Sequence, residues 1–294
     1  MMHVIFSLCE QIFLYIPLIL GAYISISLLK IPHLALDMAF VFGAVGAGKI
    51  LALLNITNAT NGLLIAITTS ILSGALVGLV TSTLHTYGKL PHLLANITTI
   101  GLFFGINIFL LQGPYMQLQS NPLALGPIQN YPEFFTILFI STIVLIAMRL
   151  FANTQISYSC AIYGMNQRFF DFYNQSSVCV VTIGLVISSA LAGLSGYLVA
   201  QTSGFVDINA GQGIALFCIT SLVIGKAITK TKKIFSLLLP CTGVFAYCLL
   251  QQVLLYAGFN GKYFPFIQAL IVAGALIAQY KKNNTQSSDL FMGV

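Results

Sequence analysis

The sequence predicts an all-α integral membrane protein, a polytopic bundle of about nine transmembrane helices. Of its 294 residues 58% are hydrophobic and only 6% are charged, whereas a soluble domain carries roughly 25% charged residues. Apolar runs of about 20 residues, long enough to cross a bilayer, lie between the polar clusters. We therefore expect one transmembrane domain over residues 1–294 rather than a soluble helical domain.

The apolar runs give nine candidate spans, within a range of eight to ten. The first is predicted to be retained, because the N-terminus lacks the basic region and cleavage pattern of a signal peptide. Turn and loop residues occupy the breaks between runs. The spans are expected at 12–29, 35–54, 62–84, 93–112, 133–151, 178–200, 213–228, 234–255 and 263–280.

The stretch 31–44 is the place where a broken or re-entrant helix is expected. Pro32 and the glycines that follow it are residues that mark discontinuous membrane helices. Such a helix would add or remove a crossing.

The basic residues predict an orientation. If the C-terminal tail with Lys281 and Lys282 is cytoplasmic, ten of the twelve Lys and Arg residues lie at cytoplasmic ends, and only Lys49 and Lys262 lie outside. The N-terminus is then expected outside. Because these residues stand at the ends of apolar runs, the net charge of +6 indicates contact with membrane lipid and not with nucleic acid.

No motif indicates covalent chemistry. Residues 43–49 match the first seven positions of a P-loop, but the eighth is Ile50 and the match lies inside an apolar run. We expect no ATP site, no metal site, no cofactor and no enzymatic activity in this chain. If ATP drives its function, a partner binds the nucleotide.

Four polar or aromatic residues are candidates for a translocation path: Asp37, Phe40, Asn96 and Asn107. Asp37 is the one acid in the first four candidate spans, and an ionisable residue there is a functional candidate. Its alternative roles are to cap a broken half-helix or to pair with Lys30 or His33. Asn96 and Asn107, eleven residues apart, share one helix face, where interhelical hydrogen bonding is the alternative. Asp207 is expected to be a loop or cap residue.

Small residues recur at helix-contact spacing in three segments. We expect them to pack the bundle, because small side chains let helix backbones approach closely in lipid. They are Gly74 and Gly78, Gly101 and Gly105, and Ser189 to Gly196.

The connection 152–177 is too polar to span the membrane and rich in aromatic residues. We predict a cytoplasmic coupling segment, a short amphipathic helix at the membrane surface that docks a partner. An interfacial helix without a partner is the alternative.

Several motifs together resemble the permease subunits of ABC importers of the branched-chain amino acid and ribose class. The resemblance is strongest to the branch that works with tryptophan/tyrosine-type binding proteins. It covers nearly the whole chain and rests on residues 29–44, 74–86, 93–99 and 189–207.

The resemblance implies a multi-pass permease of the bacterial inner membrane that imports a small organic solute. Amino acids, aromatic ones in particular, are the first candidates. It implies three partners: a cytoplasmic ABC ATPase subunit, a substrate-binding protein, and a second permease subunit in a homo- or heterodimer. It also places the ATPase contact at Tyr163, Gly164, Met165, Asn166 and Arg168, although Tyr163 and the aromatic residues after Arg168 depart from the family pattern.

Two other classes stay open. A secondary transporter or channel would need no ATPase, and would call for intramembrane acid–base pairs or charged inverted repeats. A membrane-embedded enzyme would need a catalytic constellation that the chain does not show.

Overall fold

The structure, a computed structural model, describes residues 2–54, 59–118, 132–166, 168–172, 176–229, 235–259, 261–274 and 277. Eight of the described helices are long and apolar enough to cross a membrane, which confirms the polytopic all-α class. At the ninth expected span the described part is a shorter apolar helix, Phe264–Gly274.

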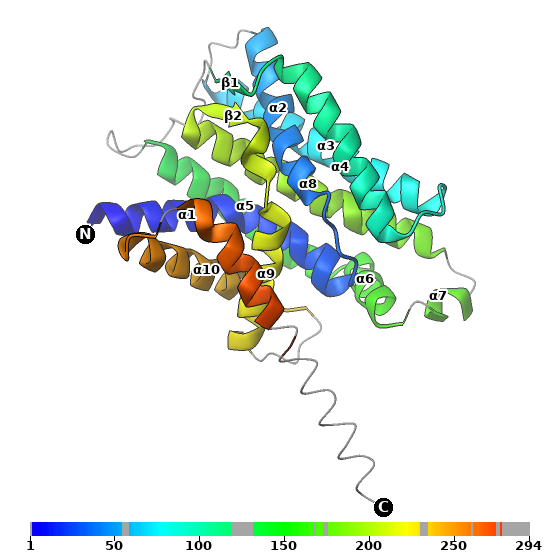
Figure 1. Cartoon of the computed structure of the whole chain (residues 1–294). Helices are drawn as coiled ribbons and strands as arrows, with labels where there is room; N and C mark the ends of the chain where they lie inside the picture. Colours follow the sequence, from blue (N-terminus) through cyan, green and yellow to red (C-terminus); the bar gives the residue numbers. More distant parts are fainter. Residues whose placement is uncertain are drawn as a thin grey trace, which may run out of the picture.

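The helices are arranged as one bundle (Figure 1). Their bounds are α1 Met2–Ala22, α2 Leu36–Leu54, α3 Ala59–Thr86, α4 His92–Leu111, α5 Pro132–Ala152, α6 Gln155–Met165, α7 Arg168–Phe172, α8 Ser177–Ser203, α9 Ile214–Thr229 and α10 Leu238–Tyr256. Between them lie a π-helix, η1 Tyr23–Leu28, the 3-10 turns η2 Ile208–Gly211 and η3 Gly261–Tyr263, and two strands, β1 Tyr115–Gln117 and β2 Phe205–Asp207.

Glycines hold α2, α3 and α8 together at the centre of the bundle. A Cβ on Gly43 of α2 would clash with the backbone of Gly193 in α8, and a Cβ on Gly193 would lie 2.6 Å from the Ser70 carbonyl oxygen of α3. Gly78 faces the backbone of Leu185 in the same way. Close backbone approach therefore confirms the packing role predicted for the small residues of α3 and α8.

The pair Gly101 and Gly105 behaves differently. A Cβ on either glycine would meet no described atom within 4 Å, so the expectation that this pair packs the bundle is wrong within this chain. Both lie on the outward face of α4, opposite the buried face that carries Asn96 and Asn107.

The P-loop-like stretch lies inside α2 and is helical throughout. Its glycines face neighbours: a Cβ on Gly46 would clash with the Ser73 side chain, and one on Gly48 would lie 2.6 Å from Met116. A helix interior offers no free backbone N–H groups to a phosphate. The stretch packs helices instead.

Two interruptions break the helical pattern. The first, from Leu29 to Ala35, separates η1 from α2 and confirms the break predicted near 31–44. The second, from Gly204 to Gly213, separates α8 from α9 and contains β2 and η2. The loop expected at Asp207 lies in this second segment, and Gly211 of the same segment packs against the Asp37 backbone of α2, a return into the bundle that the sequence does not predict.

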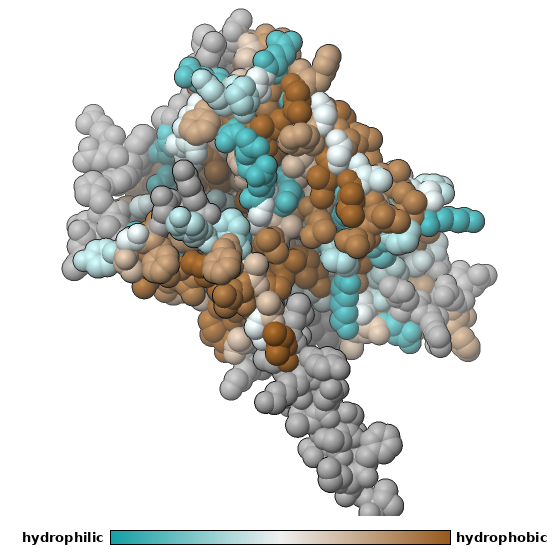
Figure 2. All heavy atoms as spheres, in the orientation of Figure 1, coloured by the Kyte–Doolittle hydropathy of each residue, from teal (hydrophilic) through white to brown (hydrophobic). Residues whose placement is uncertain are grey.

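The strands mark one end of the bundle, which we call the strand end. β1 pairs with β2 in antiparallel register, and its Met116 packs against α2 at Gly48. Figure 1 shows the strands at the top and α6 and α7 at the lower right. In Figure 2 hydrophobic residues cover most of the face drawn, while hydrophilic ones gather below the strands.

Four described basic residues lie toward the other end, which we call the basic end: Lys30, Lys89, Arg149 and Lys226. They follow η1, form the α3–α4 turn, or stand in the last turns of α5 and α9. The sequence prediction of orientation rests on this grouping, and which end is cytoplasmic stays a prediction. Lys230, Lys232, Lys233, Lys281 and Lys282 lie outside the described residues.

The central glycine contacts generate a stability prediction. Gly193→Leu should lower the melting temperature of the detergent-solubilised chain, because overpacking a tight core costs about 1–3 kcal/mol. The control is Gly101→Leu, which meets open space and replaces glycine by a better helix former. Size-exclusion chromatography after heating measures the melting temperatures of both variants. Equal melting temperatures for the two variants would contradict this packing.

Candidate translocation site and coupling surface

A buried histidine anchors the first interruption. The ring of His33 lies 2.9 Å from Asn96 Oδ1 through Nδ1 and 2.8 Å from the Ser189 hydroxyl through Nε2. His33, Asn96 and Ser189 are each at most 1% exposed. The broken segment is thereby tied to both α4 and α8.

Asn96 uses its whole side chain in this network. Its Nδ2 donates to the carbonyls of Pro32 and His92, at 3.0 and 2.7 Å. Its Oδ1 therefore accepts from His33 Nδ1 and from the backbone N–H of Ala35, the latter at 3.1 Å. This pattern assigns the His33 proton to Nδ1 and makes Nε2 the acceptor of the Ser189 hydroxyl.

The backbone explains why Asn96 is needed. Lys30, two residues after η1, has a positive φ of 55°, and Pro32 prevents the helix from resuming at once. The interruption leaves backbone groups without helical partners inside an apolar bundle. Asn96 supplies an acceptor to Ala35 at the start of α2 and a donor to Pro32, so a neighbouring helix performs the capping.

Asp37 joins the two interruptions. It lies in the first turn of α2, and its Oδ1 accepts a hydrogen bond of 2.6 Å from the backbone N–H of Ala215 in the first turn of α9. A carboxylate at a helix N-terminus is favoured by the helix dipole. The structure thus contains the half-helix cap that the sequence offered as one role of Asp37. Contact with solute stays a prediction.

Phe40 lines a small cavity of about 190 Å³ between α2, α8 and the second interruption. Apart from Ser203 and Asp207, the lining of this inner cavity is apolar or glycine. It runs from Phe40 and Gly196 toward β2. Phe40 therefore borders a hollow that leads from the interrupted helices to the strand end.

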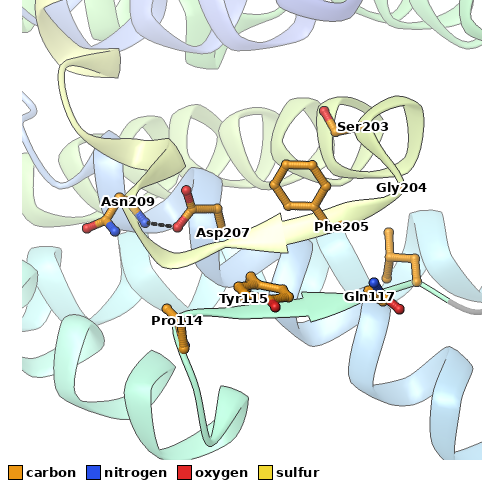
Figure 3. A pocket seen from close by; sticks show the side chains of 9 residues that line it. Pro114, Tyr115, Gln117, Ser203, Gly204, Phe205, Asp207 and Asn209 are labelled. Carbon is orange, nitrogen blue, oxygen red and sulfur yellow. Dashed lines mark hydrogen bonds between the residues drawn. The ribbon is translucent and has the colours of Figure 1, made fainter. Parts of the chain in front are cut away.

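A larger cavity of about 680 Å³ opens at the strand end (Figure 3). It shares Ser203, Phe205 and Asp207 with the inner cavity. Asp207 Oδ1 accepts a hydrogen bond of 2.9 Å from the N–H of Asn209, which caps η2 and confirms the loop or cap role predicted for Asp207. Together the two cavities form a candidate path at the strand end.

Asn107 lies on the same face of α4 as Asn96, as its spacing predicts, but in a different environment. It is fully buried, and neither its Nδ2 nor its Oδ1 has a hydrogen-bond partner among the described residues. Such a pair of buried polar atoms costs about 1–3 kcal/mol per group unless water or a ligand satisfies it. Its role in the path stays a prediction.

The residues expected to contact an ATPase divide into two groups. Tyr163 is buried and packs with Phe170, and a Cβ on Gly164 would clash with the Leu28 carbonyl oxygen. Met165 is 71% exposed and Asn166 is also exposed. Arg168 begins α7, and its side chain lies outside the described part. The first two therefore join the segment to the bundle, while Met165 and Asn166 face outward.

The segment rests on the end of the first helix. Gly164 of α6 meets the backbone at Leu28 and Leu29, and Gly184 of α8 holds the Leu29 side chain. Burial raises the pKa of the nearby Cys160 thiol to about 11, so this cysteine packs as a neutral side chain. A cavity of about 380 Å³ adjoins this contact between Tyr163, the α3–α4 turn and α8.

Two features of this site are not predicted from the sequence. The sequence analysis offers His33 only as a partner for Asp37, although an X-Pro-His run after an apolar span is a signal for a polar anchor. The strand pair was not predicted because each strand has only three residues. Among the described residues no group of three metal-ligating side chains is found.

The two asparagines of α4 generate opposite predictions. Asn96→Leu should lower the unfolding free energy by several kcal/mol, because the backbone groups of Ala35 and Pro32 and the ring of His33 lose their partners at about 1–3 kcal/mol each. Asn107→Leu should be neutral or stabilising, since it removes two buried groups that have no described partner. Melting temperatures in detergent measure both. Equal destabilisation would refute the contrast.

Sequence comparison with known proteins agrees with the membrane fold described above. Residues 4–277 match the family model of the branched-chain amino acid transport system permease component. A tyrosine transport system permease protein of Clostridioides difficile is 30% identical over 287 residues, covering 97% of this chain and 92% of that protein. No significant match was found among solved structures.

Other relatives are more distant in identity. An uncharacterised protein of Rickettsia prowazekii is 26% identical over 88% of this chain and 91% of its own length. An autoinducer 2 import system permease protein of Yersinia pseudotuberculosis is 24% identical over 79% of this chain and 68% of its own. Because the family model matches nearly the whole chain, the chain belongs to the family of branched-chain amino acid transport system permease components.

Proposed function

We infer that this chain is the membrane-spanning subunit of an ABC importer in a bacterial inner membrane. The observation that carries the inference is the join between α6 and the interrupted first helix, where Gly164 lies against the backbone of Leu28 and Leu29. A polar segment held this closely to a broken helix is placed to transmit the movement of an external partner. Membership of a permease family supports the same function.

The proposed path begins at the strand end. Solute enters the cavity beside β1 and β2, passes into the inner cavity at Phe40, and reaches the level of Asp37, where the N-termini of α2 and α9 meet. Binding sites at interrupted helices are common in transporters, because irregular backbone at membrane depth is tolerated where it lines a cavity. Asn107, with its unpaired amide, is proposed to contribute to the same path.

The proposed mechanism is alternating access. ATP binding to a cytoplasmic ATPase dimer shifts α6, and the contact of Gly164 with Leu28 passes the shift to the first interruption. His33 and Asn96 carry it to α4, and Asp37 carries it to α9. The elements that line the path thus respond to a nucleotide that the chain itself does not bind.

The proposed assembly contains two permease subunits, two ATPase subunits and a substrate-binding protein at the strand end. The solute is proposed to be an amino acid, with aromatic amino acids as the first candidates. Support comes from the relative of 30% identity, which is named a tyrosine transport system permease protein, and from the apolar lining of the inner cavity.

Association with an ATPase is the first test. The chain, co-expressed with the ATPase of its own transport system, is expected to co-purify with it in detergent. Met165→Asp should weaken this association, because it introduces a charge on an exposed apolar side chain of the proposed contact. Gln117→Glu, which introduces the same charge at the strand end, is the control.

The outcome separates the proposed importer from its alternative. If no ATPase of the host associates with the unmodified chain, the chain is better interpreted as a secondary transporter or channel. If association survives in Met165→Asp, the contact lies elsewhere on the basic end.

The rate of solute uptake tests whether Asn107 belongs to the proposed path. In proteoliposomes that contain the assembled importer, Asn107→Leu should lower the rate of solute uptake by roughly threefold to tenfold, the factor for one lost hydrogen bond, while the melting temperature holds. Thr98→Val on the outward face of the same helix is the matched control. An unchanged rate in Asn107→Leu would remove this residue from the path.

A further inference from the structure

We propose that the outward face of the β1–β2 pair is a binding site for the primary ammonium group of an aromatic or aliphatic solute. The inference rests on the proposed function, because it takes the strand end as the side from which solute arrives. It adds a chemical class of ligand and names the residues that select it.

The strand register creates this face. Tyr115 pairs with Asp207 and Gln117 pairs with Phe205, so these four side chains share one side of the pair. Met116 and Val206 share the other side and pack toward Gly48 of α2. Figure 3 shows the four residues along the two strands, at the cavity of about 680 Å³. One carboxylate, one amide and two aromatic rings therefore border a single hollow.

Asp207 has the capacity to bind a cation. Its Oδ1 accepts the hydrogen bond from Asn209, and its Oδ2 accepts none among the described residues. The described part of the chain places no Lys or Arg in an ion pair with it. A half-buried carboxylate without a counterion attracts an ammonium group, and charge-assisted hydrogen bonds are about twice as strong as neutral ones.

The two aromatic rings at the cavity also favour a cationic ligand. Tyr115 is 60% exposed and Phe205 is 45% exposed, so both rings remain open to a ligand. Tyr115 lies directly opposite Asp207 in the register, and a cation next to a ring face gains a further attraction. The cavity volume falls within the range of small-molecule sites.

The inner cavity accommodates the apolar part of the ligand. It shares Asp207 and Phe205 with the outer cavity and continues along Phe40, Val41 and Ala44. An ammonium group held at Asp207 therefore leaves the rest of the solute next to apolar walls. Anionic solutes, repelled by the carboxylate, are disfavoured at this site.

Capping of η2 is the purely structural role of Asp207, and the choice of variant separates it from binding. Asparagine caps a helix as well as aspartate does but carries no charge. Asp207→Asn therefore keeps the turn and removes the attraction for a cation. Glu133→Gln, in the first turn of α5 at the same end, removes an equal charge outside the cavity and serves as the control.

The experiment uses a cysteine reporter in the full chain. Gln117→Cys is labelled in intact cells with membrane-impermeant methanethiosulfonates, one cationic and one anionic, and the chain without the added cysteine gives the background. Phenethylamine and phenylpropionate, which share an aromatic body and differ in charge, are tested for protection against labelling. Leu118→Cys, which lines the same cavity, is a second reporter if the first variant folds poorly.

The expected result is specific. The cationic reagent should react severalfold faster than the anionic one, and phenethylamine should protect while phenylpropionate does not. Asp207→Asn should remove the charge preference and raise the phenethylamine concentration for half-protection roughly tenfold, and Glu133→Gln should change neither.

Three outcomes would overturn the site: no protection by the amine, equal protection by both compounds, or an Asp207→Asn variant that behaves like the unmodified chain. Each of these leaves the association with an ATPase untouched. Failure of the ammonium site is therefore distinguishable from failure of the importer function.

Discussion

The hydrogen bonds of Asn96 hold together the part of the bundle on which the proposed path depends. Inside a bilayer no water is at hand for a free backbone group, so a chain that leaves helical structure there must find protein partners. Asn96 provides them for Pro32 and Ala35, and it orients His33 toward Ser189. The chain can therefore stop one helix at Leu28 and start another at Leu36 without a large energetic cost.

Asp37 supplies a hydrogen-bond acceptor to the backbone at the second interruption, as Asn96 does at the first. Because its carboxylate accepts from the first turn of α9, the starts of two interrupted helices lie side by side. Their dipoles would otherwise place two partial positive charges in an apolar environment. A single acid thus stabilises both helix starts, and it ties the segment after α8 to the segment after η1.

These contacts connect the two ends of the molecule. At the basic end Gly164 joins α6 to Leu28 and Leu29, a few residues before His33. At the strand end Gly211 lies against the Asp37 backbone, only a few residues after β2. The central helices α2, α3 and α8 pack through glycine with little room to deform, so displacement is more easily accommodated at the interruptions. The two cavities at the strand end and the segment 152–177 are thereby linked through the two interruptions.

The coupling segment shows how a site can contain residues with different tasks. Tyr163 and Gly164 face the bundle, where a larger or charged side chain would disturb the fold itself. Met165 and Asn166 are exposed, so a change there leaves the packing of the bundle intact and tests the proposed partner contact. A variant at Gly164 alone would confuse loss of structure with loss of contact, and Met165 is the cleaner probe.

The sequence by itself determined the membrane class, the approximate spans, the first interruption at Pro32 and the shared face of Asn96 and Asn107. These follow from composition, from the length of apolar runs and from helical periodicity, which are local properties of the chain. The tertiary structure alone decided that Asp37 caps α9, that His33 bridges Asn96 and Ser189, and that Gly101 faces outward while Gly193 is enclosed. It also decided which side of the strand pair carries Asp207. Each of these depends on which distant segments become neighbours, and a hydrogen bond between residues more than a hundred positions apart leaves no periodic signal in the sequence.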